Sequence, residues 1–180
     1  KFIHQFASPK TYLFQVNRMY KYIFYFSLFV YIFSLVWGIL FTQEDFVQGN
    51  SFRIIYLHVP ASFFSQSIYA AMAIASVIYL IWRVKLSAYL ILAMAPIGAL
   101  VTFLALFSGS VWGIPTWGTW WQWDARITST LILFIMYLGI LTLHGSFSNL
   151  EKADRLMSIL VIIGVVNIPI IKKSVDWWST

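Results

Sequence analysis

Long apolar stretches without charge alternate with short charged segments along this chain of 180 residues. Dividing the sequence at its charged residues leaves five such stretches, at 22–43, 54–82, 86–123, 127–150 and 156–171. A helix needs about 20 apolar residues, at about 1.5 Å each, to cross a hydrocarbon core of about 30 Å. The pattern therefore predicts an all-α, polytopic membrane helical bundle with five transmembrane helices in this chain.

The fifth stretch is the shortest, so to cross the membrane this span must also use flanking residues or the segment Asn167-Ile168-Pro169 at its end. Because proline cannot donate a backbone hydrogen bond, we expect the helix to begin unwinding there. Pro96 predicts a kink in the third span. The links between spans are too short for a soluble domain, so residues 1–180 are predicted to form one membrane-embedded domain.

The composition agrees with this class of protein. Hydrophobic residues make up 61% of the chain and charged residues 10%, whereas soluble domains average roughly 45–50% and 25%. The chain has no cysteine, which excludes disulfides, thiolate metal sites and the C-x-x-C-H attachment of haem. The protein is therefore predicted not to be a c-type cytochrome.

The lysines and arginines predict the orientation of the spans. If the N-terminus is cytoplasmic, eight of the twelve cationic residues fall on the cytoplasmic side, as the positive-inside rule requires. The net charge of +6 then reflects topology and contact with anionic membrane lipids, and we expect no nucleic-acid partner. The first apolar stretch exceeds the roughly 7–15 residues of a signal-peptide core, so we expect it to remain as an anchor.

Three connectors lie on the non-cytoplasmic side in this orientation. The first covers about residues 42–53, the second carries the tryptophan-rich segment 112–126, and the third begins near Lys172. Five of the nine tryptophans fall within twelve residues of the second connector. The unusual chemistry of the chain is therefore expected on one side of the membrane.

The tryptophans of the second connector are spaced to share one helical face. If the helix continues beyond Trp117, this face carries Trp117, Trp120, Trp121 and Asp124, with Trp123 beside them. An interfacial tryptophan belt is the alternative interpretation, because indole is apolar with one polar N–H. A belt normally spreads over several span ends, so the clustering favours a flat aromatic surface for a large, flat ligand.

Two charged residues, Asp124 and Arg126, lie at the C-terminal end of this connector. Asp124 is predicted to cap a helix or to accept a hydrogen bond from an indole. Arg126 is predicted to neutralise a carboxylate of the ligand, or alternatively to extend from the start of the fourth span toward the membrane surface.

His58 is the candidate metal ligand. Pro60 suits the opening turn of a helix, which places His58 at or just before the N-terminus of the second span. A helix N-terminus disfavours imidazolium, and neutral imidazole is the form that binds iron. The alternative is an interfacial histidine bonded to water or to a carbonyl group. His4 and His144 have no comparable setting and are expected to be structural.

These motifs resemble a known family. Residues 117–124, reading WGTWWQWD, are similar to the tryptophan-rich W-G-x-x-W-x-W-D signature of membrane proteins that handle haem. The continuation ARITS at 125–129 resembles the cytochrome c maturation protein C branch of that family, whose sister branches continue with proline. The similarity extends to QGNSFRIIYLHVP at 48–60, AMAPIG at 93–98 and GVVNIPII at 164–171. The resemblance therefore covers nearly the whole chain.

The resemblance implies haem delivery in bacterial cytochrome c biogenesis. Family members are six-span inner-membrane proteins that present haem on the periplasmic face and pass it to a periplasmic haem chaperone, so the expected cargo is haem b. They work with ATP-binding-cassette transporter subunits and a small single-span membrane subunit, and they are not enzymes. Carried over by position, His58 becomes the first axial ligand of the haem iron, and Trp117, Gly118, Trp121, Trp123 and Asp124 become the signature residues. Together with Trp120 of the aromatic face and Arg126, they form the predicted haem-binding set.

The chain departs from the family pattern at its C-terminal end. The family places a second axial histidine a few residues after a tryptophan pair, here Trp177-Trp178, and that position lies beyond Thr180. We therefore expect this sequence to be truncated at the C-terminus, without the sixth span. Lys172 and Lys173 are poor substitutes for the second ligand because they are protonated at neutral pH.

A second class of function is left open by the residues. A membrane-embedded transferase acting on lipid or polyprenyl substrates could use His58 as a base and Asp124 as its partner. Such an enzyme would normally show more acidic and metal-binding residues at the interface. A purely structural transporter subunit would not need the aromatic surface. A chromophore in the purified protein would separate haem handling from both.

Overall fold

The computed structural model of the protein describes residues 9–177. In this range the chain is helical, and the described residues form no β-strand. The elements are α2 (Pro9–Leu40), the 3₁₀ helix η1 (Asn50–Ile54), α3 (Ile55–Trp82), α4 (Lys85–Trp117), α5 (Ala125–Gly145), α6 (Leu150–Gly164) and α7 (Asn167–Trp177).

The prediction of five transmembrane helices is confirmed for the described part of the chain. The segments long and apolar enough to cross a membrane are Met19–Leu40, Asn50–Trp82, Lys85–Trp117, Ala125–Gly145 and Leu150–Ser174. The protein is therefore a multi-pass membrane protein. Its third span ends at Trp117, six residues before the end of the apolar stretch in the sequence, because Gly118 leaves the helix in the left-handed region at φ 74°.

The fifth span is divided between α6 and α7. The interruption falls at Val165 and Val166, immediately before the segment where unwinding was expected, and Pro169 lies in the first turn of α7. The side chain of Asn167 donates a buried hydrogen bond of 2.8 Å to the carbonyl of Ser129 in α5. This bond stabilises the interruption, because a buried polar group without a partner is costly in an apolar setting.

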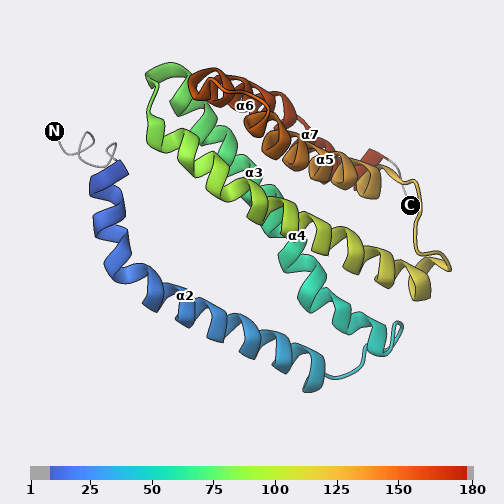
Figure 1. Ribbon diagram of the computed structural model, residues 1–180. Helices are drawn as coiled ribbons and strands as arrows, with labels where there is room; N and C mark the ends of the chain where they lie inside the picture. The colour runs from blue at the N-terminus through green and yellow to red at the C-terminus, as the bar shows by residue number, and fades with distance from the viewer. Residues whose placement is uncertain (1–8, 178–180) are drawn as a thin grey trace.

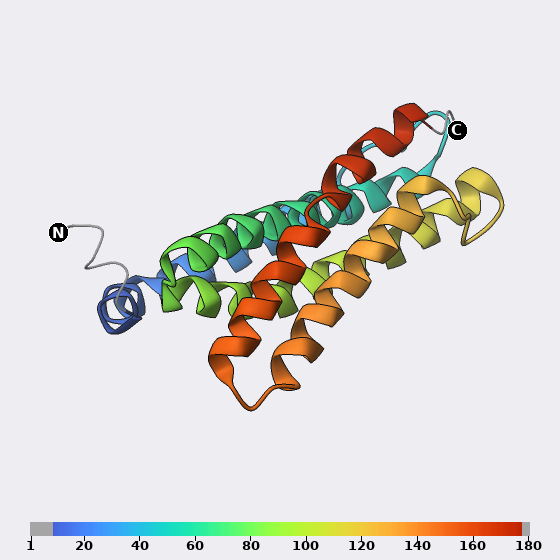
Figure 2. The same ribbon diagram turned by 90° about the horizontal axis from the view of Figure 1, so that it is seen from above.

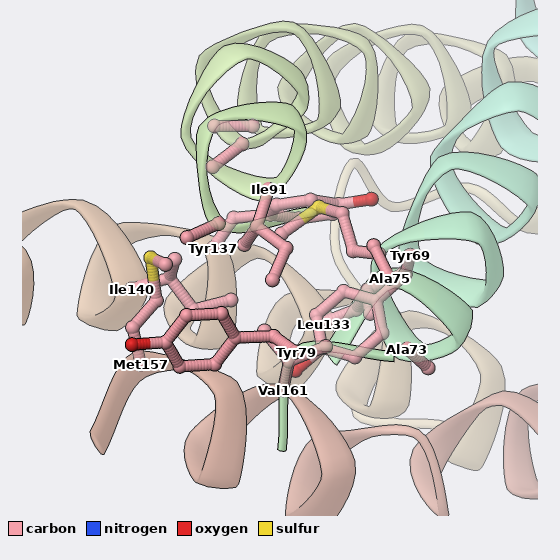
Figure 3. Packing of buried hydrophobic residues seen from close by; sticks show 14 of the residues in the cluster. Tyr69, Ala73, Ala75, Tyr79, Ile91, Leu133, Tyr137, Ile140, Met157 and Val161 are labelled. Atoms are coloured by element: carbon pink, nitrogen blue, oxygen red, sulfur yellow. The ribbon is translucent and has the colours of Figure 1, made fainter. Parts of the chain in front are cut away.

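The core combines alanines, large aliphatic side chains and tyrosine rings from several helices (Figure 3). Tyr69 of α3 and Tyr137 of α5 are fully buried, and their rings meet edge to face with centroids 5.1 Å apart. Tyr137 packs directly on Gly98 of α4, and the Tyr69 hydroxyl packs on Gly164 of α6. The phenol of Tyr137 also donates a 2.7 Å hydrogen bond to the carbonyl of Ser65. Glycines at these two positions therefore let four helices approach closely.

The helices are arranged so that the predicted connectors gather at one end of the molecule. Figure 1 shows the connector between α2 and η1, the loop between α4 and α5, and the end of α7 on the same side, away from the α3–α4 turn. Figure 2 shows α5 and α6 as an antiparallel pair joined by the link at Asn149. α2 runs apart from the other helices over most of its length (Figure 1). The end with the connectors carries the candidate site.

Candidate functional site

The candidate ligand His58 lies inside α3. It is the fourth residue of that helix, and the 3₁₀ turn η1 leads into the helix without a break. The expectation that His58 sits at or just before the helix N-terminus is therefore wrong, and Pro60 falls in the second turn. The reason is that residues 50–54 already adopt helical backbone, so the free N–H groups that would favour neutral imidazole lie further upstream.

Hydrogen bonds from α4 hold the His58 ring in place. Its Nδ1 lies 3.0 Å from the carbonyl oxygen of Ala105 and 3.1 Å from Oγ of Ser108. The Ser108 hydroxyl in turn donates 2.6 Å to the carbonyl of Leu104. A carbonyl can only accept, so Nδ1 carries a proton, and in the neutral imidazole Nε2 is then the acceptor nitrogen. The closest polar partner of Nε2 among the described residues is Oγ of Ser62, at 3.4 Å.

This is the arrangement that proteins use to prepare a histidine for a metal. A ligating histidine almost always donates its other ring N–H to a carbonyl or carboxylate group, which fixes both the tautomer and the ring orientation. The carbonyl was one of the alternatives raised for His58 as a structural residue. The same bond is compatible with ligation because it uses Nδ1 and leaves Nε2 available.

The ring of His58 fits into a space left by a glycine of α4. A β-carbon on Gly109 would lie only 2.8 Å from Cε1 of His58. The indole of Trp112 packs edge to face against the imidazole, with centroids 5.7 Å apart and planes at 72°. Trp112 is fixed in turn by the first connector, because its Nε1–H donates 2.8 Å to Oε1 of Gln48.

The tryptophan-rich segment begins one turn further along α4. A β-carbon on Gly113 would lie 3.0 Å from the carbonyl oxygen of Thr119, so the loop turns back over this glycine. Gly109 and Gly113 are four residues apart, which corresponds to about 6 Å along the helix axis. His58 and the start of the loop therefore pack on adjacent turns of the same helix.

The prediction that the tryptophans share one helical face is wrong. The helix ends at Trp117, and residues 118–124 form a loop that turns at Gly118. The indoles gather through the fold of that loop. Trp120 and Trp121 are tilted at 49° with centroids 5.9 Å apart, and Trp121 and Trp123 meet edge to face at 5.4 Å. The result is an indole cluster, Trp120, Trp121 and Trp123, without a common plane.

The indole cluster is open on one side and has an unused donor within it. Trp120 is 65% exposed and Trp123 is 72% exposed, whereas Trp121 is half-buried. The buried Nε1–H of Trp121 has no hydrogen-bond acceptor among the described residues. Trp120 and Trp121 also cover one end of an apolar pocket of about 460 Å³ between α4 and α5. Trp117, at 49% exposed, lies at the end of α4 beside this loop.

Asp124 and Arg126 lie where the loop enters α5. Asp124 is the N-cap of this helix, and its Oδ1 accepts 2.7 Å from the backbone N–H of Ile127. Its predicted role as a helix cap is confirmed, and it is the cap that fixes where the loop ends. Arg126 lies in the first turn of α5 and is exposed. The position of Arg126 thus fits either of the roles predicted for it.

The residues that hold the site together are not among those that the sequence predicts. Gln48, Ser108 and Gly109 come from the first connector and from the middle of α4, and none belongs to the tryptophan-rich segment. The spacing of Gly109 and Gly113 was the available signal, because two glycines four residues apart mark a surface where another segment can approach α4 closely.

The other histidines do not join this site. His144 lies at the opposite end of α5, where its Nε2 is 3.2 Å from Oδ1 of Asp154 in α6. His4 lies outside the described residues. Within the range that the structure describes, no three His, Asp or Glu side chains gather as a metal site would need.

Comparison with known proteins gives consistent matches. The family model described as Heme exporter protein C matches residues 2–180. The Heme exporter protein C of Escherichia coli (strain K12) is 49% identical over 181 residues, which cover 100% of this chain and 74% of the relative. The protein of the same name from Haemophilus influenzae is 46% identical over 180 residues, covering 100% and 73%. A Marchantia polymorpha relative, described as a putative cytochrome c biosynthesis ccmC-like mitochondrial protein, is 46% identical and covers 86% and 65%.

Proposed function

We infer the function from one premise: this chain belongs to the Heme exporter protein C family. We propose that it binds haem b, as cargo, at the periplasmic face of the bacterial inner membrane. The protein delivers this haem to a periplasmic haem chaperone for c-type cytochrome biogenesis. Its role is transport, without catalysis, and residues 1–180 act as one membrane-embedded domain.

The observation that carries this proposal is the state of His58. Its Nδ1 is bonded to the carbonyl of Ala105, so Nε2 is the acceptor nitrogen of the neutral ring, and its closest polar neighbour among the described residues, Oγ of Ser62, lies at a long 3.4 Å. A porphyrin already supplies four nitrogens to its iron, so the protein needs to add only axial ligands. Nε2 of His58 supplies one of them, and the iron takes the place of the long contact with the Ser62 hydroxyl. The second is proposed to be the histidine that the family places after the tryptophan pair at 177–178.

The indole cluster fits the rest of the cargo. Haem is a flat, apolar macrocycle, and exposed indoles beside an apolar pocket offer it stacking surface. The unused N–H of Trp121 can donate to a polar group of the ligand. Since Trp120 and Trp123 remain exposed, one side of the cargo stays accessible to a receiving protein. The proposed haem-binding set is therefore Trp117, Gly118, Trp120, Trp121, Trp123, Asp124 and Arg126, with His58 on the iron.

The same premise supports the proposed setting. The end with the three connectors faces the periplasm and the N-terminus is cytoplasmic, because the cations concentrate on the opposite side. Nothing in the sequence resembles a nucleotide-binding loop. From the family we infer that the protein assembles with ATP-binding-cassette subunits and a small single-span subunit, and that any dependence on ATP lies with those subunits.

The test is haem content in purified protein with matched controls. We expect His58→Ala to lose the Soret band of co-purified haem, and Trp121→Ala to retain less haem than the wild type. His144→Ala and Trp82→Ala are the controls, because these residues lie at the other end of the helices, and both are expected to keep the wild-type spectrum. Unchanged haem content in both His58→Ala and Trp121→Ala would refute the proposed site.

A further inference from the structure

Arg53 has a hydrogen-bonding capacity that the described part of the protein does not use. It lies in η1, and one terminal guanidinium nitrogen donates 2.7 Å to the carbonyl oxygen of Thr42. Its Nε is buried and has no acceptor among the described residues. A guanidinium group offers five N–H donors in a fixed plane, and leaving a charged donor buried without a partner is costly.

The acidic residues nearest in sequence are occupied elsewhere. Glu44 accepts a 2.6 Å hydrogen bond from the side chain of Asn50. Oδ1 of Asp45 accepts from the backbone N–H groups of Val47 and Gln48, which closes the turn of the first connector. None of the ion pairs found in the described part of the chain includes Arg53. The positive charge of Arg53 is therefore free to meet an anion from outside.

Arg53 lines a pocket that shares one residue, Ser108, with the surroundings of His58. This pocket has a volume of about 270 Å³ and is lined by the end of α2, the start of α3 and the middle of α4. Ser108 belongs to its wall, and the same Ser108 holds Nδ1 of His58. The remaining wall is apolar, with Leu57 and Phe107 among its residues. A guanidinium in an apolar wall near a metal ligand is a setting for an amphipathic anion.

We propose that Arg53 is a second carboxylate-binding residue of the cargo site, distinct from Arg126, and that it takes one propionate of haem. This inference rests on the proposed function. The carboxylate accepts from the Nε–H and the free terminal N–H groups of Arg53, while Thr42 keeps the guanidinium in position. Charge-assisted bonds of this kind are about twice as strong as neutral ones, so esterifying the carboxylate is expected to weaken binding about tenfold.

The experiment compares haem with haem dimethyl ester, which has the same ring and iron but no carboxylate. Each is titrated into the purified wild-type protein in nanodiscs, and affinity is read from the Soret band. We expect the wild type to prefer haem about tenfold. Arg53→Gln is expected to lose that part of the preference, with ester binding and the spectrum of the His58-ligated iron unchanged. Arg53→Lys keeps the charge without the planar donors and is expected to fall between the two.

The matched control is Arg155→Gln, which removes an exposed arginine at the opposite end of the bundle and should leave both affinities unchanged. Equal weakening of haem and ester in Arg53→Gln would assign Arg53 a purely structural role and overturn the proposal. So would an unchanged preference for haem. If Arg53→Gln loses co-purified anionic phospholipid but binds haem like the wild type, the anion bound by Arg53 is a lipid phosphate. This result also overturns the proposal. A wild-type protein that binds neither porphyrin would instead refute the proposed function itself.

Discussion

Gly109→Ala tests how the position of the His58 ring affects haem affinity, because the substitution displaces the ring without removing any polar group. The added β-carbon would lie 2.8 Å from Cε1 of His58, whereas ordinary carbon contacts begin at about 3.4–3.5 Å. The imidazole must therefore move by roughly 0.6 Å, because Gly109 belongs to the rigid backbone of α4. Trp112 packs against the same imidazole, which limits the ways in which the ring can move.

This displacement is large compared with the tolerance of the hydrogen bond that orients the ring. The bond from Nδ1 to the carbonyl of Ala105 is 3.0 Å long, and a shift of roughly 0.6 Å away from that oxygen would take it to a separation that no longer counts as a hydrogen bond. Losing the bond that orients a metal-bound histidine typically costs about 10–100-fold in metal affinity. We expect a haem affinity lower by that factor in Gly109→Ala.

The assay is titration of purified protein with haem, read as Soret intensity and position, together with thermal unfolding in the same detergent. Alanine favours a helix over glycine by up to about 1 kcal/mol, which offsets only part of the cost of overpacking and of the lost hydrogen bond, so a modest decrease in unfolding temperature is expected. Gly145→Ala is the matched control, because no atom lies within 4 Å of its β-carbon at the end of α5. Wild-type haem affinity and an unshifted Soret band in Gly109→Ala would refute the idea that this contact sets the ligand.

Two further predictions concern the support of the site. Asp124→Ala removes the N-cap bond to Ile127 and should lower the free energy of unfolding by about 1 kcal/mol, measured by chemical unfolding in detergent. Asp124→Asn keeps a capping oxygen and should retain most of that stability. An equal loss in both variants would assign the effect to the charge of Asp124 instead of its cap. Tyr137→Phe removes the buried hydrogen bond to the carbonyl of Ser65 and should lower unfolding stability by about 1 kcal/mol with haem spectra unchanged. Tyr22→Phe, at a residue 79% exposed, is its control, and a comparable loss there would contradict the assignment.

The sequence predicted the elements whose causes are local. Five apolar stretches of sufficient length became five spans, because the cost of burying charge in a bilayer acts on each segment separately. The cap at Asp124 also followed from local chemistry, since its oxygen bonds to an N–H three residues away. The resemblance to a haem-handling family, carried by contiguous motifs, is confirmed by the match of the family model.

Predictions that depended on a helix boundary were less successful. The tryptophans were expected on one helical face, but Gly118 ends α4 and a loop brings Trp120, Trp121 and Trp123 together. Likewise, helical backbone begins at Asn50, so His58 is not at a helix terminus. Periodicity gives the type of an element more reliably than its ends, because ends are decided by turns and by tertiary contacts.

The sequence alone determined which residues could serve the chemistry: one histidine near the start of a span, a group of indoles, and an arginine beside them. Only the tertiary structure decided which nitrogen of His58 is available. That choice is made by Ala105 and Ser108, 47 and 50 residues further along the chain, where Gly109 lets α3 and α4 come into contact. The burial of apolar segments depends on composition, which can be read along the chain. The tautomer and orientation of a histidine ring depend instead on a hydrogen-bond acceptor, and only the packing of α3 on α4 brings that acceptor to 3.0 Å.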